Sequence, residues 1–236
     1  MKNTIKILAA LVAMTTAIFS SASAAVIVLD FEGIAPYPNN NDIAISDFYN
    51  GGTSGAGLSG VNHGIGFSDN ALLICLNSQT VGCSNTSHGG LNPGSEEGGL
   101  YFVSGAETFM NVVAGFADGF SFNYTAINNS GIVNVYDGLN GTGNVLATIN
   151  LATTPSNCSG FNAGFCPFVA IGVQFAGIAQ SVGFGGVANQ VVFDDITFGS
   201  DIVGGDPVPL PGAIPFMITG LAGLRAATRK KKKQSA

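Results

Sequence analysis

The stretch Phe120-Ser121-Phe122-Asn123-Tyr124-Thr125 alternates aromatic and small polar side chains. Successive side chains of a β-strand point to opposite faces, so this pattern predicts a strand with its aromatic side in a core and its polar side turned outward. Similar alternation recurs along the chain, at residues 27–32, 133–136, 145–151 and 171–176. Between residues 25 and 200 we find no pattern typical of a long apolar helix.

Turn sequences rich in Gly, Asn and Ser separate these runs, at residues 128–131, 137–141 and 183–186. Many short strands at regular spacing predict an all-β fold, an antiparallel β-sandwich or jelly-roll-like body. We expect residues 25–200 to form this one β-sandwich domain and residues 201–207 to form a linker. The stretch 137–141 superficially matches a calcium loop, but Leu139 stands at the second ligand position, so we interpret it as a hairpin connection.

The first 24 residues have the pattern of a secretory signal peptide, expected as a signal helix. Lys2 and Lys6 precede an apolar run at residues 7–19, and the triplet 22–24 has small residues at both ends. Ala22 and Ala24 fit the positions recognised by signal peptidase, so we expect the mature chain to begin at Ala25.

The opposite end combines prolines, an uncharged segment and a basic cluster. Residues 208–224 contain no charged side chain, and this length is at the lower limit for crossing a bilayer core. Prolines at 209, 211 and 215 interrupt its first half, because proline breaks a helix interior. Six basic residues follow and are expected to stay cytoplasmic: Arg225, Arg229, Lys230, Lys231, Lys232 and Lys233. We therefore expect a short hydrophobic helix with transient inner-membrane contact, or, as alternatives, a plain membrane anchor or a buried hairpin.

The Pro-containing motif is Val208-Pro209-Leu210-Pro211-Gly212-Ala213. Together with the apolar run and basic end, it resembles a PEP-CTERM sorting signal of the V-P-L-P-A type. The resemblance implies that an exosortase, a membrane cysteine transpeptidase, cuts near the motif after signal peptidase has acted. It also implies delivery to the cell surface or exopolysaccharide matrix of a bacterium, with exopolysaccharide as a further expected partner. Four body segments resemble those of other PEP-CTERM proteins and imply a β-sandwich: residues 71–77, 115–124, 135–143 and 192–199.

Charge is distributed very unevenly along the chain. All eight Lys and Arg lie at the two ends, and none occurs between Ala25 and Leu224. All 14 Asp and Glu lie between Asp30 and Asp206. Without basic residues in the body, nucleic-acid binding, a Schiff-base lysine and an arginine clamp are excluded there. Divalent cations are the natural counter-ions of such an acidic body.

Two carboxylate pairs suggest a metal site. Asp30 and Glu32 are expected on one face of the first strand, and Asp194 and Asp195 in the last strand. Terminal strands of jelly rolls are often neighbours, so these oxygens could ligate a structural calcium ion. The alternative is an exposed strand face and an Asp turn. We expect no other cofactor.

The four cysteines indicate disulfides in an exported protein. Cys75 and Cys83 are eight residues apart, as are Cys158 and Cys166. Three pairings are open, and we favour the two local ones because short loops close readily. The spacing is too wide for the usual zinc motifs.

Candidate catalytic residues are few. His63 and His88 are the only histidines, neither lies next to a plausible nucleophile, and no G-x-S-x-G motif occurs. We therefore expect a non-enzymatic exported protein with a structural or ligand-binding role. The alternatives are a carbohydrate-active hydrolase that uses a carboxylate pair, or a permanently membrane-anchored adhesin.

Overall fold

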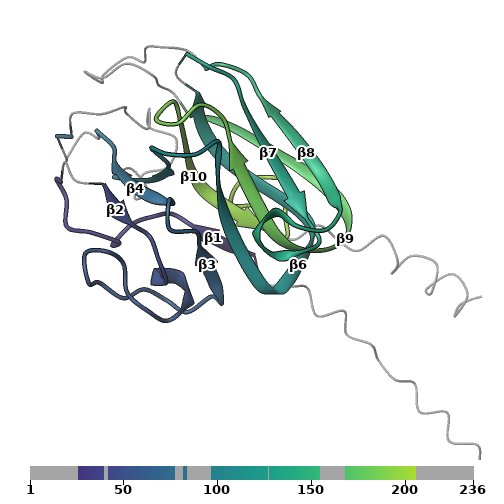
Figure 1. The fold of residues 1–236 in the computed structure, drawn as a ribbon, viewed down its shortest axis with the longest axis horizontal. Coiled ribbons are helices and arrows are strands. Elements are labelled where there is room, and N and C mark those ends of the chain that lie inside the picture. The colour runs from purple at the N-terminus through teal and green to yellow at the C-terminus, as the bar shows by residue number, and fades with distance from the viewer. Residues whose placement is uncertain are drawn as a thin grey trace, which may run out of the picture. The chain divides into compact units, whose positions relative to one another are not determined.

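The computed structural model describes residues 26–39, 42–77, 82–83, 97–126, 128–154 and 168–205 (Figure 1). The predicted signal and sorting helices lie outside these residues. The described part is all-β, with ten strands, two short 3-10 helices and no α-helix. Within it, no helix is long and apolar enough to cross a membrane.

The elements follow one another in this order: β1 (Ile27–Leu29), β2 (Ile43–Ala44), η1 (Phe48–Asn50), β3 (Ile65–Phe67), β4 (Leu72–Cys75), β5 (Gly98–Tyr101), β6 (Glu107–Ala126), β7 (Gly131–Tyr136), η2 (Leu139–Gly141), β8 (Val145–Leu151), β9 (Val169–Gly185) and β10 (Val191–Phe198).

All strand pairs are antiparallel, which confirms the predicted all-β antiparallel body. The strands form one sheet in the order β2-β4-β5-β10-β6-β9-β7-β8, to which β1 adds at β10 and β3 at β6. Non-consecutive neighbours such as β10 and β6 show that the sheet is assembled from strands far apart in sequence.

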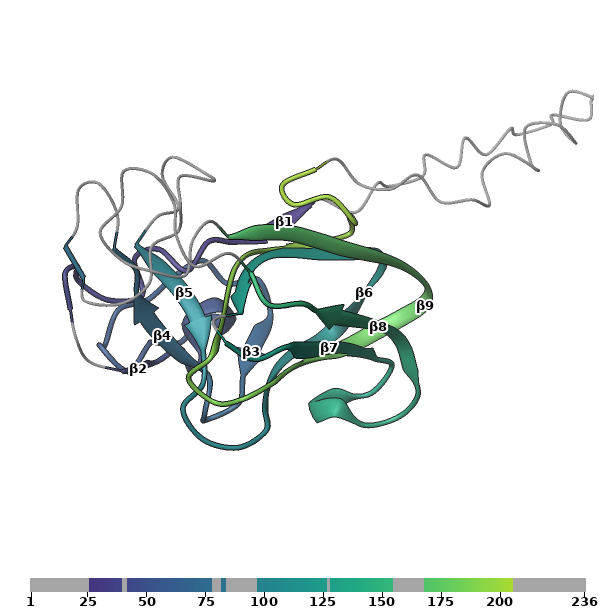
Figure 2. The same ribbon diagram turned by 90° about the horizontal axis from the view of Figure 1, so that it is seen from above.

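Two long strands let this single sheet form two layers. β6 has 20 residues and β9 has 17, and their pairing is interrupted around Phe116. Asp118 there has φ of 76°, a left-handed conformation that breaks the regular strand. One half of the β6–β9 pair joins β10 and β1 in what we call the first layer. The other half joins β3, β7 and β8 in the second layer (Figure 2).

The core lies between the two layers and is dominated by phenylalanine. Phe120 and Phe122 of β6 each lie 6.2 Å, between ring centroids, from Phe184 of β9. Phe193 of β10 lies 4.8 Å from Phe184. All four side chains are 0% exposed. The aromatic side of the stretch 120–125 is therefore buried, as its alternation predicts.

The polar side of the same stretch is buried as well, which corrects the expectation that it faces outward. Ser121 Oγ donates to the carbonyl of Ser200 at 3.0 Å, and the hydroxyls of Thr125 and Thr154 lie 2.9 Å apart. A second, smaller apolar cluster lies apart from the main core: Ile74, Leu76, Tyr101, Phe168 and Val192. The segments that contain Thr154 and Ser200, both distant from β6 in sequence, thus cover its polar side chains on the outer face of the first layer.

Candidate functional site where the first and last strands meet

The first and last strands are neighbours, as expected for the calcium hypothesis. β1 pairs with β10 so that Ile27 lies opposite Phe198 and Leu29 opposite Ile196. The residue after Leu29 is Asp30 and the residue before Ile196 is Asp195. The pairing therefore directs the two predicted carboxylate pairs toward the same end of β1.

Asp30 and Glu32 do not share a strand face, so that prediction is wrong. β1 ends at Leu29, and Phe31 has φ of 56°, which turns the chain out of the extended conformation. The backbone N–H of Glu32 then donates to Asp30 Oδ1 at 3.2 Å. The chain turns here because two tyrosine hydroxyls hold the backbone of the buried Phe31, one at its N–H and one at its carbonyl. Its N–H donates to Tyr49 Oη at 2.9 Å, and its carbonyl accepts from Tyr37 Oη at 3.1 Å.

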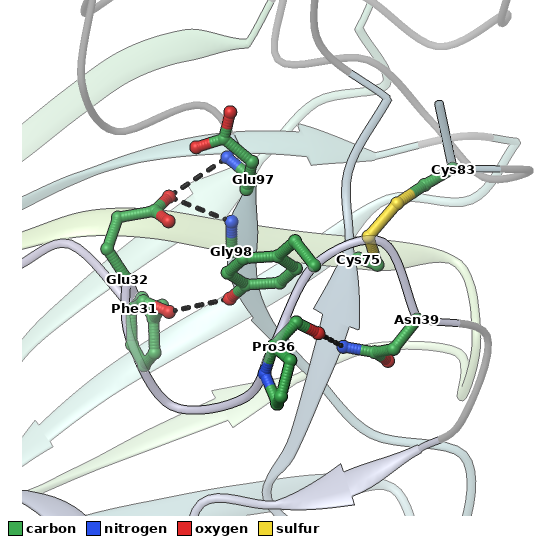
Figure 3. The surroundings of a disulfide bond; sticks show 9 residues. Phe31, Glu32, Pro36, Asn39, Cys75, Cys83, Glu97 and Gly98 are labelled. Atoms are coloured by element: carbon green, nitrogen blue, oxygen red, sulfur yellow. Dashed lines mark hydrogen bonds between the residues drawn. A yellow bond between two sulfur atoms is a disulfide. The ribbon is translucent and has the colours of Figure 1, made fainter. Parts of the chain in front are cut away.

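Glu32 joins this turn to the start of β5. Its Oε1 accepts hydrogen bonds from the backbone N–H groups of Glu97 and Gly98, both at 2.9 Å (Figure 3). Burial raises the pKa of Glu32 to about 7, because desolvation outweighs the two hydrogen bonds that favour the charged form. The nearby carboxylates of Glu97 and Asp30 push this pKa further up.

Gly98 makes this close approach feasible. A Cβ at Gly98 would lie 2.8 Å from Tyr37 Oη and would also collide with the carbonyl of Phe31. A larger residue would therefore separate β5 from the turn and break the contacts of Glu32. Burial also raises the pKa values of Tyr37 and Tyr49, so both hydroxyls stay protonated, and Tyr37 Oη is a donor to the carbonyl of Phe31.

Asp194 and Asp195 lie at a break in the pairing of β10 with β6, which shifts between Asp194 and Thr197. Asp195 has φ of 49°. Its backbone N–H donates to Asp194 Oδ1 at 2.7 Å, and its Oδ2 accepts from Asn123 Nδ2 at 2.8 Å. The two side chains are 0% and 3% exposed, so the alternative of an exposed strand face is wrong for this pair.

Electrostatics links all four predicted carboxylates. Burial raises the pKa of Asp194 well above its usual range, and the carboxylates of Asp195, Glu32 and Asp30 raise it further, in that order. The body contains no Lys or Arg to compensate such charge. Desolvation penalises the charged form of a buried carboxylate, so burial favours proton binding by Glu32 and Asp194 in the folded state.

Carboxylate oxygens are the donors that calcium prefers, so the chemistry of the donor set suits this ion. In the structure, however, the carboxylates of Asp30, Glu32, Asp194 and Asp195 are not close enough together to bind one ion. Within the described ranges, no group of three or more His, Cys, Asp or Glu side chains lies close enough together to hold a metal.

The structure also places several of the other predicted residues. Cys75 and Cys83 form a disulfide with a Cα–Cα distance of 5.9 Å, which confirms one local pairing (Figure 3). Asp137 accepts hydrogen bonds from the N–H and Nδ2 of Asn144, which lower its pKa, and the loop between β7 and β8 is the expected hairpin connection. The His63 ring lies 6.2 Å from that of Tyr49.

Several predicted positions lie outside the described residues. They are Cys158, Cys166, His88, the cleavage positions Ala22, Ala24 and Ala25, the motif at 208–213, and the basic residues Arg225, Arg229, Lys230, Lys231, Lys232 and Lys233.

Sequence reasoning missed Tyr37, Tyr49 and Asn123 as members of this site. The two tyrosines lie in loops without a periodic pattern, and Asn123 belongs to the polar side of a strand that was expected to face solvent. A buried carboxylate needs polar partners, so the burial of Asp194 is the one signal for them, and this burial becomes visible only in the structure.

No protein-family model matches the chain, and no curated protein sequence does. Among solved structures, the catalytic domain of a GH87 alpha-1,3-glucanase in complex with nigerose aligns at 14% identity and a TM-score of 0.37. The alignment covers 62% of this chain and 27% of that one, so the chain spans about a quarter of the glucanase domain. An adhesin domain of Lys-gingipain from Porphyromonas gingivalis aligns at 15% identity and a TM-score of 0.28, covering 76% of this chain and 93% of that chain. At these scores neither similarity assigns a function.

Proposed function

We propose that this chain is a non-enzymatic exported β-sandwich protein, sorted by an exosortase to the cell surface or exopolysaccharide matrix. There it acts as a structural or ligand-binding component. The observation that carries the proposal is the order of the C-terminal segments. A proline motif, an uncharged run and a cluster of six basic residues follow a body that has no Lys or Arg.

Charge and covalent structure support this proposal. Six basic residues after a short apolar segment resist translocation, whereas the acidic body before them meets no such barrier. The Cys75–Cys83 disulfide suits an oxidising compartment. The last described strand, β10, ends at Phe198, so a cut between residues 207 and 212 leaves all ten described strands intact.

The intact mass of the mature protein in cell-surface and medium fractions tests the proposal. The expected mass lacks residues 1–24 and everything beyond a cut between residues 207 and 212. A mature protein that still contains Lys230 to Lys233 would instead be a permanently anchored adhesin.

A pair of variants shows whether the motif directs the cut. Pro209→Ala/Pro211→Ala changes the motif, and Pro215→Ala is the matched control within the same tail but outside the motif. We expect the double variant to keep its tail and the control to be processed normally. Equal processing of both would contradict sorting through the motif.

The alternative of a hydrolase needs two carboxyl groups that contact substrate. Among the carboxyl groups of the described residues, the two with raised pKa values are Glu32 and Asp194, and Asp194 is 0% exposed. A fully buried carboxyl group cannot protonate a glycosidic oxygen, so this pair favours a structural role.

Structural calcium is the finer part of the proposal. Asp30, Glu32, Asp194 and Asp195 would move closer together to ligate the ion, which would neutralise charge that no Lys or Arg offsets. Adding calcium to chelator-treated protein is then expected to raise the melting midpoint at pH 7.5. An unchanged midpoint would exclude a structural ion at this site.

A further inference from the structure

The outer face of the second layer differs from that of the first, because its central side chains remain partly accessible. Glu107, Phe109 and Asn111 of β6 alternate with the buried Thr108 and Met110 and are all half-buried. The neighbouring strands continue the same face. Gly183 of β9 pairs with Phe109 on one side and with Asn134 of β7 on the other.

Two aromatic rings and one carboxylate converge over Gly183. A Cβ built on this glycine would lie 3.0 Å from the Phe109 ring, 3.3 Å from the Tyr136 ring and 2.9 Å from Glu107 Oε2. The absence of a side chain at 183 therefore lets both rings approach the sheet from opposite sides. We call Glu107, Phe109, Asn134 and Tyr136 around Gly183 the outer platform.

One end of the outer platform is bounded by the loop between β7 and β8. The N–H of Asn140 donates to Asn111 Oδ1 at 2.7 Å, and Asn111 Nδ2 donates back to Asn140 Oδ1 at 2.8 Å. The N–H of Gly141 donates to Ser181 Oγ at 3.0 Å. These bonds fix the loop against β6 and β9, so the platform is presented by a preorganised surface.

Tyr136 is distinct among the tyrosines of the chain. Tyr49, Tyr101 and Tyr124 are 4% to 5% exposed and form hydrogen bonds inside the protein. Tyr49 Oη accepts from the N–H of Phe31, whereas the hydroxyls of Tyr101 and Tyr124 donate. Tyr37 Oη donates to the carbonyl of Phe31 at the turn between Asp30 and Glu32. Tyr136 is half-buried on an outer sheet face, where an aromatic ring can contact a ligand.

The surroundings of the rings are polar but almost uncharged. From residue 119 to residue 193 the chain has a single charged side chain, Asp137, whose carboxylate is bound by Asn144. Asn134 Oδ1 accepts from Thr148 Oγ1 at 2.8 Å, which orients its amide and keeps the NH2 group as a donor. Glu107 adds acceptor oxygens.

We infer that the outer platform binds a neutral saccharide chain through the Phe109 and Tyr136 rings. This inference specifies the ligand of the ligand-binding role proposed above and rests on that role. A sugar ring offers an apolar C–H face to an aromatic ring, and hydroxyl groups at its rim pair with an amide donor and carboxylate acceptors. An anionic polymer would meet Glu107 and no cation, so a neutral chain is the matching ligand.

Two other ligand classes fit the surface less well. A lipid would require a continuous apolar patch, but Asn111, Asn134 and Thr148 interrupt the rings and Ile132 on this face. A peptide that adds a strand would pair with an edge, whereas β6, β9 and β7 are interior strands with neighbours on both sides.

Affinity electrophoresis in native gels tests the inference with the full chain in mild detergent. The gels contain dextran, galactomannan or xyloglucan as neutral polymers, or alginate as an anionic one. We expect at least one neutral polymer to retard the protein and alginate not to. Phe109→Leu and Tyr136→Leu keep an apolar cover over Gly183 without a ring, and each is expected to weaken binding about tenfold.

Ile132→Ala is the matched control, because it removes an exposed apolar side chain from the same face without removing a ring. It is expected to bind nearly as the unaltered chain does. The inference is overturned by mobility unchanged in all three neutral gels, by equal binding of the leucine variants, or by retardation in alginate alone. A lower melting midpoint with unchanged binding would show that the rings only cover Gly183. This binding test is independent of the sorting proposal, because a protein that keeps its C-terminal tail can still bind a polysaccharide and migrate more slowly.

Discussion

Glu32 connects the protonation state of the protein to its fold. The side chain holds the first residues of β5 through two backbone hydrogen bonds, yet burial makes its charged form unfavourable. In most proteins a buried carboxylate is offset by Arg or Lys, and this body has neither. Protons are therefore the available neutralising species at this site when no metal is bound.

The first prediction concerns pH. The pKa of Glu32 is about 7 in the folded state and near 4.5 when exposed, so the folded state binds the proton more tightly between these values. Its contribution to stability is complete below the lower value and is lost as pH rises through 7. With the chelator present, thermal melting is expected to show a decrease of about 1–2 kcal/mol in stability from pH 5 to pH 8, after allowance for partial exposure.

Glu32→Gln supplies the test of this assignment. The amide keeps an acceptor oxygen for the N–H groups of Glu97 and Gly98 but carries no charge. We expect a flatter pH profile and a higher midpoint at pH 8. Asp69→Asn, at an exposed carboxylate, should keep the original profile. If both variants show the same dependence of stability on pH as the unaltered chain, Glu32 does not control that dependence.

The second prediction concerns the disulfide that follows β4. Closing a loop with a sequence separation of 8 restricts the unfolded chain and is expected to stabilise the fold by about 2–3 kcal/mol. Urea unfolding of Cys75→Ala/Cys83→Ala should show this loss. Peptide mapping without reduction should recover Cys75 joined to Cys83 and, by the same spacing argument, Cys158 joined to Cys166. A crossed pairing would contradict the local arrangement.

At the scale of elements, the bent strands β6 and β9 hold the two layers together. β9 carries Phe184 into a cluster formed by Phe120 and Phe122 of β6 and by Phe193 of β10. Each ring contacts rings from the opposite layer or a neighbouring strand, so loss of one leaves a cavity that the others cannot fill without moving.

The third prediction follows from this packing. Phe184→Ala is expected to reduce the free energy of unfolding by about 3–5 kcal/mol, because it removes a fully buried ring. Val187→Ala lies three residues further on, is 49% exposed, and should change stability by less than about 0.5 kcal/mol. Urea unfolding at fixed pH measures both. Similar small losses in both variants would show that the phenylalanine cluster is not the joint between layers.

Periodicity predicted the elements better than it predicted their surroundings. The alternation at 120–125 gave a strand with its aromatic side buried, since that pattern depends on neighbouring residues alone. The burial of Ser121 depends on Ser200, which is distant in sequence, and could not be predicted locally. The end of β1 was misplaced because the left-handed Phe31 is imposed by Tyr37 and Tyr49, not by its neighbours.

For the candidate site, the sequence predicted which strands meet but not the local geometry of the side chains. That β1 and β10 meet follows from a general property of jelly rolls, and the structure confirms it. The break in pairing between Asp194 and Thr197 has no signal in the sequence, yet it brings Asp195 to Asn123. The outer platform escaped prediction because it depends on the register that sets Phe109 and Asn134 on either side of Gly183.

At the scale of the whole described body, the two outer sheet faces differ in what covers them. Residues 199–205 lie against the first layer, where Gln174 Nε2 donates to Asp201 Oδ2 at 3.0 Å and the N–H of Gly199 to the carbonyl of Gly119 at 2.9 Å. The described chain therefore leaves from the first layer, while the outer platform lies on the second.

The last prediction follows from the charge of the exported body. Residues 25–206 contain 14 Asp and Glu and no Lys or Arg, so like charges repel throughout the folded state. Salt shortens the range of this repulsion, from about 30 Å at 0.01 M to about 8 Å at 0.15 M. We expect the melting midpoint at pH 8 to rise over this range of sodium chloride with chelator present, and to rise equally in choline chloride. A difference between the two salts would indicate a specific sodium site. A constant or falling midpoint would contradict the prediction, because it would mean that repulsion between the carboxylates does not limit the stability of the body.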